Sequence, residues 1–399
     1  MSQTEAVTQH KPWEAYTPPP LMAAPIAVAG VAAVASMAAA AGVAAAAGLA
    51  AGPHVTQTRI VVMSQPGTDA SAEDVTRAIA VEEGAAVPTP APGKLLVRLT
   101  ARPVHPADIM LVKGSYPGAS NAKLPAVPGY EGTGVVEDAN NVEGWAKGER
   151  VHAVCDSVSA GQGSWQQFVV LPPAKLHRVP HGMAEDVAAQ SRGNPATALG
   201  MLETLAPPAG ERVIQTAAAS TLGRMFIALA KMRGVRTVNI IRMGAGREAQ
   251  LEELASLGAD LVLASDTDDI VGRVREVTSG VGAWGAVDAV GGALTQRLMS
   301  AVREGGTVLV YGALAGNTCT CSVMDMVGRD VKVNGFMLTR WLADLSDDQK
   351  SEAMDKLDGW LMDGSVPALV AGKYALADAK DAIMATLKSG RSGKVILMG

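Results

Sequence analysis

A tyrosine in a loop bounded by glycine and proline is the side chain best suited to donate a proton. Tyr116 lies in the segment 113–117, between Gly114 and Pro117. A phenol stays protonated at neutral pH and can donate a proton to negative charge that develops on a substrate. The same position would also suit a turn tyrosine that packs beside Pro117. The residue type alone therefore leaves a catalytic and a packing interpretation open.

A glycine-poor turn between a strand and a helix is the candidate site for nucleotide phosphates. Residues 217–223 read Ala-Ala-Ala-Ser-Thr-Leu-Gly and follow an apolar strand. Of the three glycines typical of a dinucleotide-binding turn, only Gly223 remains, in the helix-packing place. Small side chains still permit close approach, and a helix N-terminus offers its amides to phosphate. We therefore predict nucleotide contacts at Ser220, Thr221, Leu222 and Gly223, with an ordinary strand–helix turn as the alternative.

An arginine follows at the end of the next expected strand. Arg242 lies 19 residues after Gly223, where an acidic residue would accept the ribose hydroxyl of NAD. An arginine in that place suits the 2′-phosphate of NADP instead. Arg247 follows across a Gly-Ala-Gly turn and is expected to assist. Surface arginines at strand ends are common, so Arg242 has a plain structural interpretation as well.

Metal chemistry and nucleic-acid binding are both disfavoured by composition. The chain has three cysteines and six histidines, and Cys319 and Cys321 are separated by one residue. Structural zinc needs four ligands at regular short spacings, so we predict no metal site and no disulfide framework. The charge is mildly acidic, with 34 basic and 39 acidic residues and no basic cluster. We therefore expect no nucleic-acid partner.

The stretch around Tyr116 resembles the catalytic-domain signature of the medium-chain dehydrogenase/reductase superfamily. The resemblance includes Pro106-Ala107-Asp108, Leu124-Pro125 and the turn Gly129-Tyr130-Glu131. It is most similar to the 2-enoyl thioester reductases of mitochondrial fatty acid synthesis. Zinc-dependent members carry a histidine where this chain has Tyr130, so the resemblance implies zinc-free chemistry. It also implies that Tyr116 is the proton donor and that the cofactor is NADPH.

The same resemblance assigns further site residues. The segment Asn194-Pro195-Ala196-Thr197-Ala198 resembles an element that opens a helix near the active site. The cofactor contacts that the resemblance implies in addition to the turn are Asn194, Thr197, Gly312 and Lys394. Phe336 and Trp341 resemble the aromatic walls of an acyl pocket, although aromatic residues at such spacing are otherwise ordinary core.

The elements that must position these residues predict an α/β fold. We expect short strands at 59–63, 94–99, 132–137, 148–153 and 163–170, as in a partly closed β domain. Strands at 211–216, 236–242, 260–264, 285–290 and 307–311 then alternate with helices at 220–233, 248–257, 270–278 and 294–303. This rhythm predicts a doubly wound parallel sheet. The tail adds a helix at 378–388 and a strand at 394–398.

By the resemblance, residues 57–190 and 341–399 form a GroES-like catalytic domain, and residues 191–340 form a Rossmann cofactor-binding domain. Residues 1–56 form an N-terminal extension. No Asp, Glu, Lys or Arg occurs from Ala15 to Thr58, and residues 21–52 are almost wholly Ala, Gly and Val. A helix of that length exceeds the roughly 20 residues that span a bilayer.

Three interpretations of this extension compete. They are a transmembrane or partner-buried helix at 21–52, a low-complexity linker and a targeting peptide. Transit peptides are rich in arginine, whereas Lys11 is the only lysine or arginine before Arg59. We predict a mitochondrial protein, with inner-membrane association through residues 21–52 left open.

The leading functional hypothesis is NADPH-dependent reduction of acyl-CoA or acyl-carrier-protein 2-enoyl thioesters. Quinone reduction is a neighbouring hypothesis, since zinc-free relatives use quinones. A third is an accessory subunit of a mitochondrial membrane complex, in which NADPH binding has been lost. It is suggested by departures from the family pattern, namely His105, Met110, Thr216 and Ala219 in place of asparagines. A homodimer is compatible with each of these hypotheses.

Overall fold

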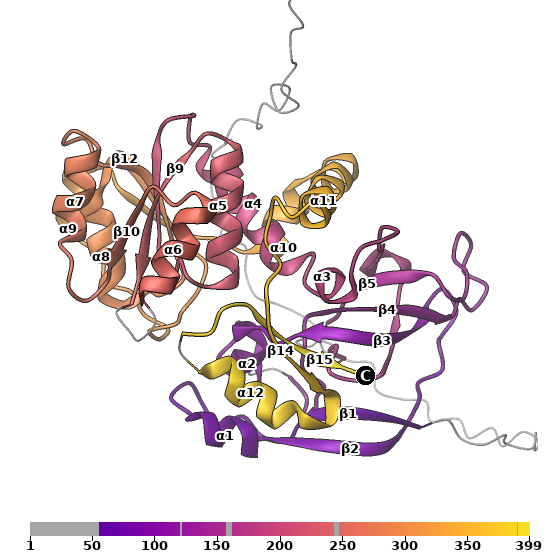
Figure 1. The fold of residues 1–399 in the computed structure, drawn as a ribbon. Coiled ribbons are helices and arrows are strands. Elements are labelled where there is room, and N and C mark those ends of the chain that lie inside the picture. Colours follow the sequence, from indigo (N-terminus) through magenta and orange to yellow (C-terminus); the bar gives the residue numbers. More distant parts are fainter. Residues whose placement is uncertain (1–55, 120–121, 157–161, 243–246, 389) are drawn as a thin grey trace, which may run out of the picture. The chain divides into compact units, whose positions relative to one another are not determined.

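The computed structural model describes residues 56–399, apart from 120–121, 157–161, 243–246 and 389 (Figure 1). The described residues belong to one compact unit. The predicted helix at 21–52 lies outside the described residues. Among the helices that are described, none is long and apolar enough to cross a membrane.

The β-rich part of the chain is organised around one mixed sheet. Its strands follow the order β14-β15-β3-β4-β5-β7, and β6 also pairs with β3. Their bounds are β3 Leu95–Pro103, β4 Glu131–Asp138, β5 Arg150–Val154, β6 Phe168–Leu171, β7 Leu176–Arg178, β14 Val370–Ala375 and β15 Lys394–Met398. Strand β15 lies antiparallel to β3, with Ile396 opposite Pro103. The C-terminal strand therefore joins a sheet formed mostly by residues 95–178.

Smaller elements surround this sheet. Strands β1 (Thr56–Val62) and β2 (Ile79–Ala86) form an antiparallel pair, and the helices are α1 (Ala72–Arg77), α2 (Pro106–Lys113), α3 (Glu185–Ala189) and α12 (Ala379–Leu387). Apolar residues of β1, α1, α2, α12 and β15 share one buried core, which includes Ile60, Val75, Val112, Ile383 and Leu397. Helix α2 is thereby held between the two ends of the described chain.

The second sheet is parallel throughout. Its strands are β8 (Arg212–Gln215), β9 (Arg236–Ile241), β10 (Leu261–Ala264), β11 (Ala283–Asp288), β12 (Val302–Val310) and β13 (Lys332–Gly335). They follow the order β10-β9-β8-β11-β12-β13, which is the doubly wound arrangement with its switch point between β8 and β11. The predicted α/β fold class, a GroES-like β-rich part and a Rossmann sheet, is confirmed.

Helices cover both faces of the parallel sheet (Figure 1). They are α4 (Gly193–Leu205), α5 (Thr221–Met232), α6 (Arg247–Leu257), α7 (Ile270–Val277), α8 (Gly292–Ala301) and α9 (Val323–Arg329). One core packs α4 and α5 against β8 and β11, and another packs α7 and α8 against β8 and β9. Because both faces are covered, the strands read as continuous apolar runs, which is why the sequence predicts them well.

Two differences from the expected elements have identifiable causes. Strand β12 begins at Val302 rather than at 307. The register shifts between Ala283 and Gly285 of β11, so that Val302 pairs with Ala283 before Thr307 pairs with Gly285. Helix α11 (Asp347–Met362), which follows α10 (Leu338–Asp344), was not predicted. Its signal is the capping box of Ser346 and Gln349, which closes the first turn before Met354, Leu357 and Leu361 are buried.

Candidate active site

Tyr116 continues from the C-terminus of α2 and is held there by backbone bonds. The amides of Ser115 and Tyr116 donate to the carbonyl of Met110, at 2.9 and 3.2 Å. Gly114 adopts the left-handed conformation that ends the helix, with φ 77°. Tyr116 is half-buried, and its hydroxyl lies 3.9 Å from Sδ of Met337. The phenol proton therefore has only a weak acceptor in the described structure.

The ring of Tyr116 packs on the ring of Tyr130. The two centroids are 5.2 Å apart and the planes are inclined by 52°. This tilted arrangement is one that aromatic pairs favour. Tyr130 directly precedes β4. By the resemblance it stands where zinc-dependent members have a zinc-ligating histidine, and here it contacts the candidate proton donor.

Glu131, the first residue of β4, is a buried carboxylate with three N–H donors. Nε2 of His105 lies 2.7 Å from Oε1, while Nε2 of His152 and the amide of Gly193 each lie 2.9 Å from Oε2. Glu131 is only 3% exposed. Burial alone would raise the pKa of Glu131, but the bonds from His105 and His152 outweigh it and hold the pKa below its usual range. The carboxylate is therefore ionised at neutral pH.

Lys394 joins the same cluster through His105. Its Nζ lies 3.0 Å from Nδ1 of His105, and Lys394 is only 3% exposed. Burial lowers the pKa of Lys394 to about 8, so the amine is mostly charged at neutral pH. A charged amine only donates, so Nδ1 accepts and Nε2 of His105 carries the proton given to Glu131. We call Lys394, His105, Glu131 and His152 the buried polar cluster.

Asp108 borders this cluster in α2. Its Oδ2 accepts from the backbone amide of His105 at 2.7 Å, while Oδ1 is buried and has no partner among the described residues. Burial raises the pKa of Asp108 to about 6, against an opposing effect of His105. The N-terminus of α2 is therefore fixed by its own carboxylate as well as by Glu131.

The turn from β8 to α5 is built for close backbone approach. A Cβ at Gly223 would lie 2.5 Å from the carbonyl oxygen of Ala218, so only glycine fits there. The hydroxyl of Ser220 accepts from the amide of Gly223 at 3.0 Å. The first-turn amides of Thr221 and Leu222 have no acceptor within the helix, as at any helix N-terminus. The turn thus fits a phosphate group.

The turn also contains an unusual backbone conformation and two side chains that anchor it. Ala217 has φ 51°, in the left-handed region that favours glycine. The hydroxyl of Thr216 lies 2.9 Å from Oδ1 of Asp288 and ties β8 to β11. Buried Arg224 contacts the carbonyl oxygen of Ala219 and pairs with Glu253 of α6 at 2.6 Å. Thr216, which stands where the resemblance has an asparagine, therefore makes a bond that holds two strands together.

The other expected cofactor residues are dispersed. Arg242 is exposed just after β9, and the side chain of Arg247 lies outside the described residues. A Cβ at Gly312, after β12, would lie 2.6 Å from the carbonyl oxygen of Ala289. The hydroxyl of Thr197 bonds the carbonyl of Gly193 at 2.7 Å, within the first turns of α4 that also hold Asn194. Arg242 and the β8–α5 turn lie on adjacent strand ends, whereas Lys394 is engaged by His105.

The two expected acyl-pocket aromatics pack on helix α4. A Cβ added to Gly200 would lie 2.7 Å from Trp341 and 2.8 Å from Phe336. Both rings are half-buried and lie against the core that α4 and α5 share. Met337, between them in sequence, is the residue beside the Tyr116 hydroxyl. The segment 336–341 therefore connects the candidate proton donor to α4.

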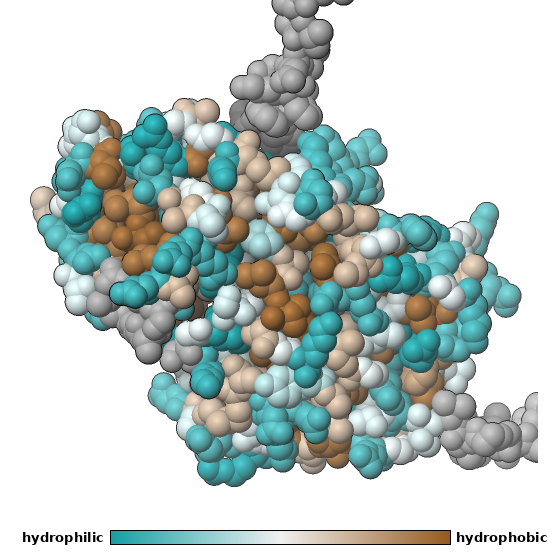
Figure 2. Space-filling view, viewed as in Figure 1, coloured by the Kyte–Doolittle hydropathy of each residue, from teal (hydrophilic) through white to brown (hydrophobic). Residues whose placement is uncertain are grey.

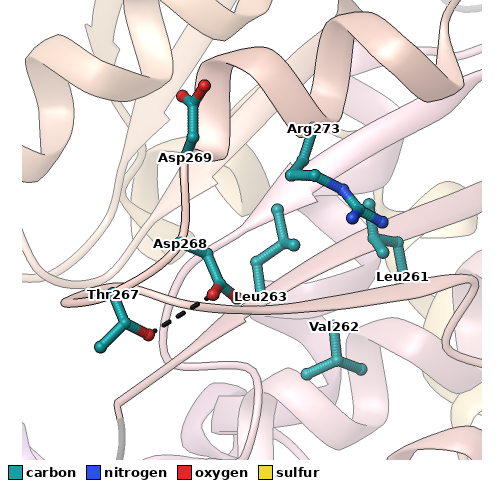
Figure 3. Close-up of a pocket in the computed structure, with 7 residues that line it drawn as sticks. All are labelled: Leu261, Val262, Leu263, Thr267, Asp268, Asp269 and Arg273. Atoms are coloured by element: carbon teal, nitrogen blue, oxygen red, sulfur yellow. Dashed lines mark hydrogen bonds between the residues drawn. The ribbon is translucent and has the colours of Figure 1, made fainter.

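A separate hollow of about 290 Å³ lies at the edge strand β10. Figure 2 shows apolar surface gathered over this region, and Figure 3 shows the hollow's lining. The lining residues are Leu261, Val262, Leu263, Thr267, Asp268, Asp269 and Arg273. None of the expected site residues is among them.

Within the described residues, no group of three or more His, Cys, Asp or Glu side chains could hold a metal ion. In the buried polar cluster the imidazole nitrogens bond the carboxylate directly, which leaves no space between them for an ion. Sequence reasoning missed Glu131, His152 and Asp108 as parts of the site. A glutamate at the start of an apolar strand was the available signal, because a buried carboxylate requires partners.

Comparison with known proteins places both sheets in one family. A family model described as alcohol dehydrogenase GroES-like domain matches residues 91–181, and one described as zinc-binding dehydrogenase matches residues 221–357. The chain is 33% identical to mitochondrial enoyl-[acyl-carrier-protein] reductase of Arabidopsis thaliana, over 68% of this chain and 71% of that protein. Identity to the Homo sapiens protein of the same name is 32%, over 75% of this chain and 80% of the relative.

Solved structures are similar along most of the chain. A structure described as an NADPH:quinone reductase from Bacillus thuringiensis is 27% identical with a TM-score of 0.75, covering 86% of this chain and 99% of the other. An Escherichia coli quinone oxidoreductase complexed with NADPH has the same TM-score at 21% identity, with coverage of 86% and 100%. The second similarity extends to the fold alone.

Proposed function

Because the chain belongs to the medium-chain dehydrogenase/reductase superfamily, we propose that it reduces 2-enoyl thioesters with NADPH and that Tyr116 donates the proton. The observation that supports this most is the placement of Tyr116. Its ring packs against Tyr130, while among the described residues its hydroxyl has only Sδ of Met337 as a neighbouring acceptor. A phenol that is oriented but weakly bonded can donate its proton to a substrate.

The reaction forms one C–H bond at the β-carbon and one at the α-carbon of the thioester. When bound, the nicotinamide cofactor supplies the hydride for the β-carbon. The phenol O–H of Tyr116 gives its proton to the α-carbon and so neutralises the enolate charge. The phenolate recovers a proton from water, since Tyr116 is only half-buried. The first-turn amides of Thr221 and Leu222 would hold the pyrophosphate, and Arg242 the 2′-phosphate.

The direct test is NADPH oxidation by the full chain with trans-2-enoyl-CoA or the acyl-carrier-protein substrate. We expect Tyr116→Phe to lower kcat by about 100-fold or more with unchanged NADPH affinity, because general-acid catalysis contributes that much. Tyr374→Phe, at a half-buried tyrosine on β14, is the matched control and should retain activity. A folded, NADPH-bound wild type without enoyl turnover would overturn the proposal.

Cofactor preference has its own test at Arg242. We expect Arg242→Ala to weaken NADPH binding by about 1.5 to 3 kcal/mol, the range for a hydrogen bond to a charged group, and to leave NADH binding unchanged. Arg236, exposed at the opposite end of β9, provides the control Arg236→Ala. Equal affinity of the wild type for NADPH and NADH would show that Arg242 does not contact the 2′-phosphate.

Quinone reduction is the second candidate, favoured by the 27% identical structure described as an NADPH:quinone reductase. Hydride transfer to a quinone needs no positioned acid in the protein, since quinone oxygens can be protonated by water. A Tyr116→Phe variant with full quinone activity, in a wild type that lacks enoyl turnover, would favour this candidate.

A non-catalytic accessory role is the third candidate, and the engagement of Lys394 by His105 favours it. Calorimetric titration with NADPH decides it, because a protein that binds no nucleotide is not a reductase of this type.

The names of the relatives support a mitochondrial location. Fractionation of mitochondria with the full chain and with residues 1–53 removed would test both that location and association with the membrane.

A further inference from the structure

The two ends of helix α2 contact adjacent residues of the chain. At its N-terminal end, His105 bonds Glu131 at 2.7 Å. Beyond its C-terminal end, the ring of Tyr116 packs on that of Tyr130, with centroids 5.2 Å apart. Tyr130 and Glu131 are neighbours in sequence, so the start of β4 supports α2 at both ends. A shift of α2 along its axis would disturb both contacts together.

Hydrogen bonds at both ends of α2 connect His105 to Tyr116. His105 precedes the first helical residue, and its own amide is bonded by Asp108 at 2.7 Å. At the other end, two amides bond the carbonyl of Met110, and the amide of Ala119 bonds the carbonyl of Tyr116 at 2.8 Å. Gln65 adds a bond to the carbonyl of Ala119 at 2.9 Å. These bonds tie Tyr116 to the C-terminal end of α2.

The ring of His105 is held from two sides. Both of its ring nitrogens are engaged, Nδ1 by Lys394 of β15 and Nε2 by Glu131 of β4. The ring bridges a buried ammonium and a buried carboxylate, and charge-assisted bonds of this kind are short and directional. The cluster also fixes α4, because Glu131 accepts the amide of Gly193.

We propose that His105 is a positioning residue for Tyr116, because it sets the place of α2 between β4 and β15 and so fixes the orientation of the phenol ring. The inference rests on the proposed function for its kinetic consequence. Its structural consequence, a fixed Tyr116 ring, does not depend on turnover.

The test uses the full chain with 3-fluorotyrosine in place of tyrosine, observed by fluorine NMR. The chain has five tyrosines, and Tyr116→Phe assigns the resonance of interest. We expect His105→Leu to shift or broaden the Tyr116 resonance and to leave that of Tyr374 unchanged. His105→Gln, whose amide can accept from Lys394 and donate to Glu131, should restore much of the wild-type spectrum. His181→Leu, at an exposed histidine, is the control.

Kinetics with the enoyl thioester provide the second readout. We expect His105→Leu to lower kcat about 10- to 100-fold while KM for NADPH stays within about twofold, since misplacing a catalytic group by about 1 Å costs that much. His105→Gln should recover to within about fivefold of the wild type by the same argument. A ring that served only the stability of the fold would lower the melting temperature without this split between kcat and KM.

The outcomes separate the two proposals. If the Tyr116 resonance responds to His105→Leu but the wild type reduces no enoyl thioester, the positioning role stands and the proposed function fails. If the resonance is unchanged in a folded His105→Leu variant, the positioning role is wrong whatever the turnover. Should His105→Leu not fold, Lys394→Met carries the test, because it leaves the histidine ring but removes one of its two supports. An unchanged resonance there would show that the bond from Lys394 does not help to place Tyr116, and would overturn the part of the inference that rests on β15.

Discussion

The buried polar cluster and the β8–α5 turn hold their functional groups in opposite ways. The cluster joins side chains of β4, β5, β15 and the residue before α2, and His105, Glu131, His152 and Lys394 are all buried. The turn is formed by alanines, a serine cap and Gly223, and it offers mainly backbone amides. One region depends on pairing of charges and the other on the room available to the backbone.

This difference predicts how each region responds to substitution. Removing one partner from the cluster leaves buried donors or charges unpaired, which is expensive in a dry interior. Changing the turn alters steric fit or backbone strain, which costs less and can even be favourable. We therefore expect larger losses of stability in the cluster than in the turn, and substitutions at Glu131, Asp108, Gly223 and Ala217 test this.

The largest effect is expected from Glu131→Leu. Loss of the carboxylate leaves Nε2 of His105, Nε2 of His152 and the amide of Gly193 without their acceptor. We expect the free energy of unfolding to fall by about 3 to 5 kcal/mol, the range for a broken buried pair. Urea unfolding measures it. Glu137→Leu is the control, since Glu137 lies on the same strand with surface partners Arg98 and Lys147 and should cost at most about 1 kcal/mol. Equal losses at both glutamates would contradict the comparison.

Asp108, which borders the buried polar cluster, should make the free energy of unfolding depend on pH. Burial raises its pKa to about 6 from the usual 3.8, so the folded state favours the protonated form. The stability that it contributes is present below pH 3.8 and is lost as the pH rises through about 6. Relative to Asp108→Asn, the wild type should gain about 2 to 3 kcal/mol between pH 7 and pH 4. Unfolding of both proteins across that window tests this, and a constant difference would show that Asp108 does not titrate there.

Gly223→Ala should have a moderate effect in the turn. The new Cβ would lie 2.5 Å from the carbonyl oxygen of Ala218, so α5 must move away from the turn. We expect a loss of about 1 to 3 kcal/mol, as for overpacking elsewhere, together with weaker NADPH binding. Thermal unfolding and a binding titration measure the two effects. At Gly328 of α9 an added Cβ would meet nothing within 4 Å, so Gly328→Ala should be neutral or stabilising. Similar losses at both glycines would show that the close approach is not responsible.

The smallest effect of these substitutions in the turn and the cluster, and a favourable one, is expected from Ala217→Gly. Alanine at φ 51° carries strain of about 1 to 2 kcal/mol, which glycine relieves at an entropic cost of about 0.5 to 1 kcal/mol. The net gain should be about 0.5 kcal/mol. Ala219→Gly, in the same turn but outside the left-handed region, should instead lose stability. Precise chemical denaturation of both variants decides whether the turn is strained.

The sequence predicted most of the parallel half of the fold closely, although strand β13 was not among the expected elements. Strands 236–242 and 260–264 and the helix 270–278 match β9, β10 and α7 to within a residue or two. These elements alternate at short range, and each reads as an apolar run or a helical face that local pattern reveals. Gly223 was likewise singled out from its place in the turn, where the structure leaves no room for a side chain, and its contact with a cofactor stays a prediction. Tyr116 was singled out by its flanking residues, and its catalytic role stays a prediction.

The tertiary structure alone decided how the charged residues of the β-rich half are paired. Lys394 and His105 are 289 residues apart in sequence, and they meet only because β15 inserts beside β3. From the sequence, Lys394 was expected at the cofactor and His105 counted only as a departure from the family pattern. Strand pairing between distant segments has no local signature, so a side chain's charge partner is not visible in its neighbours. Pattern therefore determined the elements, whereas their assembly determined which buried charges neutralise one another.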